Sequence, residues 1–541
     1  MERREFLAKT AKGLGAATIL PLVSGLNRCA SKLFKRPNVL LFIVEDLNMQ
    51  LRCYGKSYMH TPNIDRLASE GLKFDQAYVQ QAVCAASRAS LFTGLFPQST
   101  GVDYPYSYYF VEEILPKYGT LTERFQKNGY YTRDFGKIQH GVDNHLSTIP
   151  FKPDNGPYMM PENIALKKEK GGAAVPPYEM GELLEDTYPD AQTAKAVIKE
   201  LQSRKQSDQP FFLSVGFLKP HLPLAAPKKY WDLYKRDEIP LAENKYRPKN
   251  CPPIAIDRYN LKQYQWEHSD PDRLFSDDYA RLIRHAYFAC VSFMDAQVGQ
   301  VLNELDKLNL RDDTIVFFLS DHGFHLGEQN HWGKTTLFES SLHVPLILSV
   351  PGMQHCGQSS TAFVEYVDIF PTLLELVDIK VPDYLEGVSF EPLLKNPERN
   401  WKKATFSVQS RSMITEEYGY SMRTTRYRYT EWRNDADETM IARELYDLKN
   451  DPGETVIIAE KVGQSLLNKL SKQLRDGWEN ALPEGVKNRS HNPVAPPSYA
   501  WGPEGDSRRA AWHEKFGGKE GDDWWLLTKQ RLQKSQNKME Y

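Results

Sequence analysis

Polar residues that could do chemistry follow four stretches of the sequence that are predicted to be buried strands. They form four pairs: Glu45 and Asp46, Lys137 and His140, Lys219 and His221, and Asp321 and His322. In an open parallel sheet the carboxyl ends of the strands lie along one edge, and ligands bind at that edge. The sequence therefore predicts that these pairs, although far apart in the chain, meet in one site that contains both anions and cations.

The acidic members of this set have the composition of a metal site. Glu45, Asp46 and Asp321 supply three carboxylates, and His322 adds an imidazole. Three carboxylates close together repel one another unless a cation joins them, and oxygen-rich ligation favours a hard ion such as Ca²⁺ or Mg²⁺. A single acid at a strand end is more often a helix cap or half of a surface ion pair. The prediction of a divalent metal therefore depends on the four residues together.

The basic residues near the strand ends have the composition of an anion site. They are Arg88, Lys137, His140, Lys219, His221 and Lys334. A lysine in a loop is usually solvated, but several cations that converge could hold a sulfate or phosphate group. The two histidines could transfer protons near neutral pH, where imidazole titrates. A lone histidine is more often structural, so their catalytic role depends on the other cations.

Cys84 is the candidate nucleophile. Residues 84–93 are predicted to form a helix that begins at this cysteine and ends at Gly94. A helix N-terminus presents free backbone N–H groups and the positive end of the helix dipole, and both stabilise an anion. A thiol in that position could act as a nucleophile. The ordinary alternative is a buried structural cysteine.

The elements that would position these residues are typical of an α/β protein. Apolar runs, each typical of a strand in a parallel sheet, occur at residues 38–44, 130–135, 210–217, 314–320 and 344–350. Helical patterns lie between them: Thr61 and Pro62 have the residue types of a helix start, and Thr120 and Glu123 have capping-box spacing. This alternation predicts a large α/β/α sandwich around a mostly parallel, mixed central sheet.

The chain of 541 residues is predicted to contain three parts. Residues 1–36 form a signal peptide and linker, residues 37–395 form the catalytic domain, and residues 396–541 form a smaller subdomain with an extended tail. More alternating polar segments, followed by one helical pattern, predict an antiparallel sheet and a helix in the last part. Residues 154–188 are predicted to form a long surface loop.

The first residues predict export. Arg3 and Arg4 precede an apolar run at residues 13–26 that is too short to span a bilayer. This pattern predicts a signal peptide that resembles the twin-arginine kind, and hence a periplasmic or extracellular protein. Cys29 suggests lipid attachment, although Arg28 stands where a small residue is expected. The alternative is an ordinary disordered N-terminus; no further segment is predicted to cross a membrane.

Charge and cysteine content exclude other classes of function. The formal net charge is −2, which gives no reason to expect a nucleic-acid-binding surface. An anionic substrate would need a local cluster of cations. The six cysteines are scattered without a CxxC pair, which argues against a zinc site or a dense disulfide framework.

Several motifs, in order, resemble the type I sulfatase family, which depends on formylglycine. The signature is Cys84-Ala-Ala-Ser-Arg88, followed by Thr93-Gly94. Further motifs are Thr61-Pro-Asn-Ile-Asp-Arg-Leu-Ala68, Gly136-Lys137, Ser320-Asp-His-Gly323 and Leu445-Tyr-Asp-Leu448. The runs Gln81-Ala-Val-Cys84, Lys219-Pro-His221 and Phe293-Met-Asp-Ala-Gln-Val-Gly299, with His322, resemble the iduronate-2-sulfatase branch. The resemblance implies an alkaline-phosphatase-like fold.

The resemblance also implies a cofactor and a modification. One Ca²⁺ per chain would be held by Glu45, Asp46, Asp321 and His322 with an oxygen of the modified Cys84. A formylglycine-generating enzyme, or an anaerobic sulfatase-maturating enzyme, would oxidise that cysteine to formylglycine. Its hydrate would attack the sulfur of a sulfated saccharide, and the resulting geminal diol ester can eliminate sulfate without attack by water.

The resemblance assigns roles to the cations as well. Arg88 and Lys137 would steady the aldehyde hydrate and the sulfate, and His140 would help the hydrate to collapse. His221 and Lys334 would contact the sulfate and the leaving oxygen, with His221 as the proton donor. Lys219 is a weaker candidate for the anion site.

Two residues depart from the family pattern, and two other functions compete with sulfate-ester hydrolysis. Glu45 stands where the family has aspartate, which makes it the least certain ligand, and Ala86 replaces the common proline, as the broader signature allows. A phosphodiesterase or phosphonate monoester hydrolase could use the same cations, because phosphate is also a tetrahedral anion. A catalytically inactive binder of sulfated glycans is the other alternative; it would not need both Cys84 and Arg88.

Overall fold

The computed structural model describes residues 36–100, 102, 119–139, 156–256, 264–268, 270, 272–412, 417–434 and 439–486. Residues 1–37 and 38–541 are two separate units, and every element named below belongs to the second. The predicted signal peptide, the end of the tail and His140 lie outside the described residues. Among the described residues, no helix is both long enough and apolar enough to cross a membrane.

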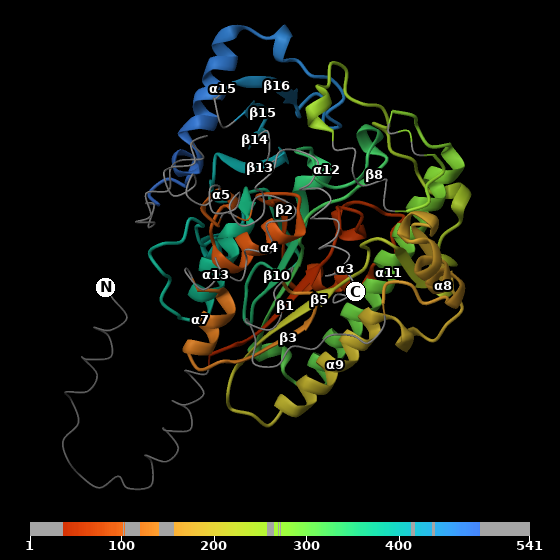
Figure 1. The fold of residues 1–541 in the computed structure, drawn as a ribbon. Coiled ribbons are helices and arrows are strands. Elements are labelled where there is room, and N and C mark those ends of the chain that lie inside the picture. The colour runs from red at the N-terminus through yellow and green to blue at the C-terminus, as the bar shows by residue number, and fades with distance from the viewer. Residues whose placement is uncertain are drawn as a thin grey trace, which may run out of the picture. The chain divides into compact units, whose positions relative to one another are not determined.

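A mixed eight-stranded sheet forms the centre of the larger domain (Figure 1). Its order is β11-β2-β10-β7-β1-β5-β3, and β12 also pairs with β2. The strands are β1 (Asn38–Val44), β2 (Leu72–Tyr78), β3 (Tyr131–Gly136), β5 (Phe211–Phe217), β7 (Thr314–Ser320), β10 (His343–Ser349), β11 (Gln358–Ser360) and β12 (Val364–Glu365). Strands β3, β5, β1 and β7 run parallel, and β10 runs antiparallel to β7 and β2. The predicted mostly parallel, mixed sheet is confirmed.

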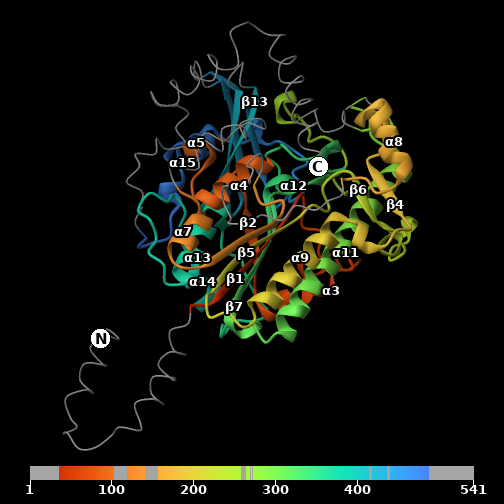
Figure 2. The same ribbon diagram turned by 60° about the horizontal axis from the view of Figure 1, so that its bottom comes forward.

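Helices cover both faces of this sheet, as Figure 2 shows. The side chains of β1 alternate between two apolar cores: Leu40 and Phe42 belong to one, and Leu41 and Ile43 to the other. The first core also contains side chains of α3 (Pro62–Glu70), α9 (Pro189–Arg204) and α11 (Asp277–Lys307). The second contains side chains of α4 (Cys84–Thr93), α7 (Leu121–Lys127), α13 (Ile369–Leu376) and α14 (Glu391–Lys395). The domain is therefore the predicted α/β/α sandwich.

Two of the predicted helix starts behave differently. Thr120 and Glu123 form the expected reciprocal capping box at the start of α7. Thr61 stands at the N-cap of α3, but its side chain makes no capping hydrogen bond. Its hydroxyl instead accepts from the backbone N–H of Arg52 and donates to Asp65. Thr61 therefore joins α3 to the preceding turn.

The C-terminal part contains a second, antiparallel sheet of four strands in the order β13-β14-β15-β16. The strands are β13 (Ala404–Ser412), β14 (Glu417–Thr424), β15 (Tyr427–Asn434) and β16 (Met440–Asp447). Helix α15 (Gln464–Asp476) buries Leu467, Leu470 and Leu474 in the same core as these strands. The predicted antiparallel sheet is confirmed, while the predicted boundary between residues 395 and 396 remains a prediction.

The prediction of a long loop over residues 154–188 is wrong for the described residues from 156 onward. This segment contains α8 (Pro161–Lys170) and β4 (Tyr178–Gly181), and β4 pairs with β6 (Leu224–Pro227). Helix α8 buries none of its residues, so its sequence has no apolar stripe from which a helix could be predicted. The remaining short elements are α5 (Pro97–Thr100), α10 (Lys228–Trp231), α12 (Glu339–Leu342), β8 (His325–Leu326) and β9 (Trp332–Gly333).

Glu386 makes the stability of this fold depend on pH. Its buried carboxylate accepts hydrogen bonds from Phe96 N and Ser99 Oγ, both at 2.6 Å, and burial raises its pKa to about 7. Because the folded-state pKa lies above the unfolded value, the stabilisation is complete below about pH 4.5 and is lost as pH rises through about 7. We expect Glu386→Gln to raise the free energy of unfolding by roughly 2 kcal/mol at pH 8 and by little at pH 5.

Urea unfolding of both proteins between pH 5 and 8 measures this difference. The exposed Glu398 gives a matched control, and Glu398→Gln should change the unfolding free energy by about 0.5 kcal/mol or less. A pH-independent effect of Glu386→Gln would contradict the prediction.

Candidate functional site

The ends of two neighbouring strands bring the acidic residues together. Strands β1 and β7 are parallel, and Val44 pairs with Ser320, so the next residues of both strands leave the sheet side by side. The backbone N–H of Asp46 donates to Asp321 Oδ1 at 3.0 Å. Asp46 has a φ of +59°, a left-handed conformation that aspartate adopts more readily than most residues. The structure thus brings the pair Glu45 and Asp46 into contact with the pair Asp321 and His322.

Helix α4 places Cys84 against these acids. The helix begins at Cys84, as predicted, and Gly94 ends it with a φ of +68°. The thiol Sγ lies 3.0 Å from Lys334 Nζ, 3.2 Å from His322 Nε2 and 3.4 Å from Glu45 Oε1. The sulfur therefore faces an ammonium group, an imidazole and a carboxylate.

The residues around Cys84 fit a metal ion. Three overlapping sets have ligand atoms within 4.8 Å of one another: Asp46, Cys84 and His322; Glu45, Cys84 and Asp321; and Glu45, Asp46 and His221. The four predicted ligands other than Cys84 are at most 1% exposed, and they are Glu45, Asp46, Asp321 and His322. Buried carboxylates in such numbers need nearby positive charge. These carboxylate oxygens are suitable ligands for a hard divalent ion, which prefers oxygen.

Two lysines supply positive charge to the acids. Lys137 Nζ forms an ion pair with Glu45 Oε1, and Lys334 Nζ lies 2.7 Å from Asp46 Oδ1. Burial would raise the pKa of Glu45, but His221, Lys137 and other cations lower it well below its ordinary range. Burial would lower the pKa of Lys334, and Asp46 with other anions raises it well above its ordinary value. The pKa shifts of Glu45 and Lys334 therefore favour their charged forms.

Neighbouring charges shift the pKa values of Asp321, His322 and Cys84 toward their charged forms. Burial opposes ionisation of Asp321, yet His322 and Arg88 lower its pKa to about 2. Burial also opposes protonation of His322, yet Asp321 raises its pKa to about 9. The pKa of the Cys84 thiol is lowered in spite of burial, chiefly by Lys334. The arrangement favours a thiolate next to an imidazolium.

Arg88 joins the acidic strand ends to the segment that carries Lys137. Its Nε lies 3.0 Å from Asp321 Oδ2, and both side chains are fully buried. Its Nη1 donates to the main-chain oxygens of Lys137 and Ile138 at 2.6 and 2.9 Å. Its buried Nη2 has no hydrogen-bond partner among the described residues. A buried N–H group without a partner is costly, and an anionic ligand would satisfy it.

The two predicted residues of the segment after β5 have different surroundings. His221 Nε2 lies 3.8 Å from Glu45 Oε1 and 3.9 Å from Asp46 Oδ2, and its Nδ1 donates to Leu222 O. Lys219 Nζ instead donates to the carbonyls of His221 and Pro223, at 3.2 and 2.6 Å. Lys219 therefore holds the backbone that carries His221. Its assignment to the anion site stays a prediction.

Sequence reasoning missed the residues that fix the strand ends. Tyr287, in α11, donates from its hydroxyl to Asp46 O at 2.6 Å and accepts from Asn48 N at 2.9 Å. Ser320 Oγ accepts from Leu47 N at 2.9 Å and donates to His322 O at 2.7 Å. A tyrosine within a long apolar helix has no sequence signal for this role. Ser320 does have one, because it is the last residue of a predicted strand whose next two residues are candidate ligands.

Close contact between two glycines places Lys137. Gly136 has a φ of +69°, and the backbone N–H of Lys137 donates to Gly216 O at 3.3 Å. A Cβ atom on Gly216 would lie 1.8 Å from the carbonyl oxygen of Lys137. We expect Gly216→Ala to lower the free energy of unfolding by about 3 kcal/mol, because the backbone must move. Urea unfolding would measure this change.

Gly463 provides the control for that substitution. A Cβ atom there would meet no atom within 4 Å, and its φ of −67° suits alanine. Gly463→Ala should change the unfolding free energy by about 0.5 kcal/mol or less. Equal effects of the two substitutions would show that the contact at Gly216 does not constrain Lys137.

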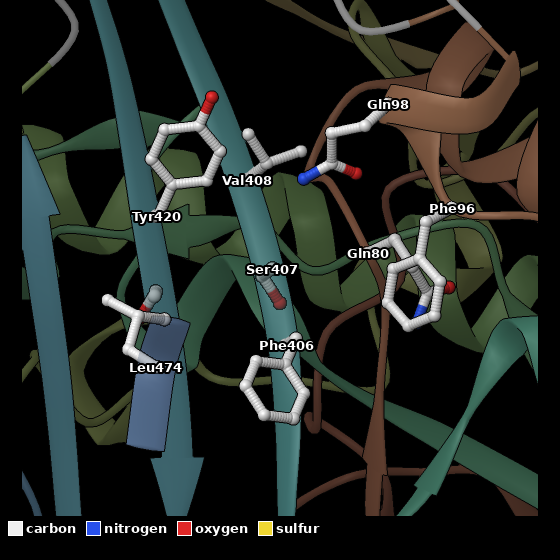
Figure 3. Close-up of a pocket in the computed structure, with 9 residues that line it drawn as sticks. Gln80, Phe96, Gln98, Phe406, Ser407, Val408, Tyr420 and Leu474 are labelled. Atoms are coloured by element: carbon white, nitrogen blue, oxygen red, sulfur yellow. The ribbon is translucent and has the colours of Figure 1, made fainter. Parts of the chain in front are cut away.

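The pocket in Figure 3 is separate from this polar site. Its lining contains none of the predicted metal ligands or catalytic residues, and consists of Gln80, Phe96, Gln98, Phe406, Ser407, Val408, Tyr420, Ser421 and Leu474. Residues from β13, β14 and α15 meet residues near α4 and α5 there. The pocket is thus a small gap where the C-terminal sheet and α15 contact the segments near α4 and α5.

Comparison with known proteins agrees with this geometry. Residues 37–379 match the family described as Sulfatase, and residues 327–480 match the family described as N-sulphoglucosamine sulphohydrolase, C-terminal. Iduronate 2-sulfatase of Mus musculus is 33% identical over 497 residues, covering 77% of this chain and 89% of that protein. Iduronate 2-sulfatase of Homo sapiens is also 33% identical, over 494 residues, with 77% and 90% covered.

The fold has relatives among solved structures. The phosphonate monoester hydrolase of Agrobacterium radiobacter superposes with a TM-score of 0.65 at 23% identity, covering 82% of this chain and 96% of that one. This likeness supports the alkaline-phosphatase-like fold. The family match over residues 37–379 and the similarity to the two iduronate 2-sulfatases establish the family. The chain belongs to the sulfatase family and is a sulfuric ester hydrolase of the iduronate-2-sulfatase type.

Proposed function

We propose that this sulfatase removes sulfate from a sulfated saccharide and that its nucleophile is a formylglycine made from Cys84. The contacts of Cys84 Sγ with Lys334, His322 and Glu45, at 3.0 to 3.4 Å, are the observation that carries this proposal. The position of Cys84 at the start of α4 also supports the proposal. The saccharide substrate is proposed from the two iduronate 2-sulfatases, whose names specify a sulfated sugar.

The same residues would hold one Ca²⁺. Glu45, Asp46, Asp321 and His322, with an oxygen of the modified Cys84, form the proposed ligand set, and their overlapping groups of ligand atoms support it. When bound, calcium supplies positive charge that lowers the repulsion between an anionic sulfate ester and the three carboxylates. Glu45 Oε1 also forms an ion pair with Lys137.

The chain's own cations would bind the sulfate group. Arg88 Nη2, buried and without a described partner, would donate to a sulfate oxygen. Lys137 and Lys334 lie beside Glu45 and Asp46 and would add two ammonium groups. His221 Nδ1 is occupied by the carbonyl of Leu222, so Nε2 would deliver the proton to the leaving oxygen. The proposed help of His140 in the collapse of the hydrate concerns a residue outside the described ones.

Maturation and export belong to the same proposal. Formylglycine, once formed, supplies a hydrated aldehyde as the nucleophile, so the protein needs a formylglycine-generating or anaerobic sulfatase-maturating enzyme as a partner. The signal-peptide pattern of residues 1–36 supports a periplasmic or extracellular location. The catalytic domain would extend over residues 37–395.

One experiment tests the proposal directly. The protein is produced with a maturing enzyme, the mass of the peptide that contains Cys84 is measured, and sulfate release is assayed on a panel of sulfated saccharides. We expect the mass to show replacement of the thiol by an aldehyde, together with sulfate release from at least one saccharide. An intact thiol would contradict the proposed nucleophile, and faster cleavage of phosphonate monoesters would favour the competing hydrolase.

A further inference from the structure

The segment that carries Lys334 is held by the C-terminal sheet. Residues 334–339 connect β9 with α12 and contain the ammonium group that contacts both Asp46 and Cys84. Residues of β13, β14 and β15 contact this segment at three points, which are Thr335, Leu337 and Glu339. The C-terminal sheet thus reaches the proposed catalytic site through this connection.

Arg411, in β13, makes the first of these contacts. Its Nη1 donates to Thr335 O at 2.6 Å, its Nε to Ile254 O at 2.7 Å and its Nη2 to Ala255 O at 3.0 Å. The guanidinium carbon lies 4.8 Å from the centre of the Trp432 ring. Three hydrogen bonds and the contact with the Trp432 ring fix the orientation of the guanidinium group. The single ammonium group of a lysine could not make all of these contacts.

Thr335 itself has a backbone conformation that needs support. Its φ is +68°, in the left-handed region that β-branched residues rarely adopt. Its N–H donates to Ala82 O at 3.2 Å, and His331 Nε2 donates to the neighbouring Lys334 O at 2.9 Å. A strained residue persists only where its surroundings hold it in place, and such residues cluster at functional sites.

Leu337 and Glu339 extend the same contact. A Cβ atom on Gly419, in β14, would lie 2.7 Å from Leu337 Cδ1, so the sheet approaches the segment closely because this position is glycine. Glu339 Oε1 accepts from Arg423 Nε at 2.9 Å and also from Arg428. Apolar packing and ion pairs therefore fix the end of the segment, while Arg411 fixes the residue next to Lys334.

We propose that Arg411 is a positioning residue that holds the strained Thr335 backbone and thereby keeps the Lys334 ammonium at the reacting centre. The C-terminal sheet is then part of the catalytic apparatus, although Arg411 does not itself touch the substrate. The effect on turnover rests on the proposed function of Lys334. The effect on the backbone of residues 334–335 does not.

Arg411→Met tests this inference, because methionine keeps an apolar stem beside Trp432 and removes all three donors. In the mature enzyme we expect kcat to fall by about 10- to 100-fold with KM changed by less than about threefold, as a small misplacement of a catalytic group can cause. Arg411→Lys should recover part of the loss, because one ammonium can still reach one carbonyl. Arg426→Met is the matched control: that arginine pairs with Asp447 and is 51% exposed, so kcat should stay within about twofold.

Two further measurements distinguish positioning from general destabilisation. In a Lys334→Ala background, Arg411→Met should lower the remaining kcat by less than about twofold, since coupled residues are not additive. The Thr335 amide should also exchange its hydrogen at least about tenfold faster in Arg411→Met than in Arg426→Met. Full additivity with Lys334→Ala, or unchanged exchange at Thr335, would overturn the inference. If the unsubstituted protein releases no sulfate, the proposed function fails, and the exchange measurement still decides the role of Arg411.

Discussion

Cys84→Ala is expected to abolish sulfate release, with kcat falling by at least about 10⁴-fold, while the fold remains intact. Alanine cannot be converted to an aldehyde, so the variant lacks the proposed nucleophile. Alanine is compatible with the first turn of α4, and the segment keeps its apolar contacts. We expect the midpoint of thermal unfolding to move by no more than a few degrees. Sulfate released from the best saccharide of the panel, and thermal unfolding, measure the two effects.

Cys53→Ala provides the matched control. Cys53 is a partly buried free thiol whose pKa is raised to about 12 by burial and by Asp65, and it lies outside the predicted site. Its removal should leave turnover within about twofold. If Cys84→Ala retained even a tenth of the turnover, the reaction would use another nucleophile.

Asp321→Asn is expected to weaken calcium binding by roughly 100-fold or more. Loss of a residue that only supports a ligand can already weaken metal binding by about 10- to 100-fold, so loss of a ligand should have at least that effect. The substitution removes one of three carboxylates without changing the shape of the side chain. It also neutralises the partner of the fully buried Arg88, and loss of a buried ion pair costs about 3 kcal/mol of unfolding free energy. Isothermal titration calorimetry with calcium and urea unfolding measure the two effects.

The effect of Asp321→Asn on stability should depend on pH. The folded-state pKa of Asp321, about 2, lies below its ordinary value of 3.8. Its ionised form therefore stabilises the fold above about pH 4, and this contribution is lost as pH falls through about 2. The variant should lack that part of the acid dependence. Asp306→Asn is the control, because Asp306 is 42% exposed in its pair with Arg66; calcium affinity unchanged in both variants would remove Asp321 from the ligand set.

The central sheet was predictable because its signals are local. The run at residues 38–44 is apolar at every position, and the structure buries it on both faces as β1. Parallel pairing of β1 with β7 then brings Glu45, Asp46 and Asp321 together, since each follows directly on a strand end. The helix that begins at Cys84 was predictable from Gly94, which ends it. Strand-end chemistry therefore gives the composition of the candidate site.

Three features of the fold and of the site could not be predicted from the local sequence pattern. Lys219 follows a strand end as Lys137 does, but its ammonium bonds two carbonyls of its own loop. Arg411 sits in a strand of the other sheet, and nothing in its local pattern indicates that it reaches Thr335. Helix α8 packs too little apolar surface to show a period of 3.6 residues. The contact of Arg411 depends on which surfaces meet, and a single sequence does not contain that information.

The complete burial of α4 limits when Cys84 can be modified. All ten residues of this helix are buried, and Cys84 is 6% exposed. A modifying enzyme that grips the residues around the thiol cannot reach them once the helix has packed against the sheet. On the proposed modification, oxidation would have to precede closure of the domain during biosynthesis. The fraction of molecules with the aldehyde would then depend on the rate of modification relative to the rate of folding. A chain that folded before modification would keep the thiol.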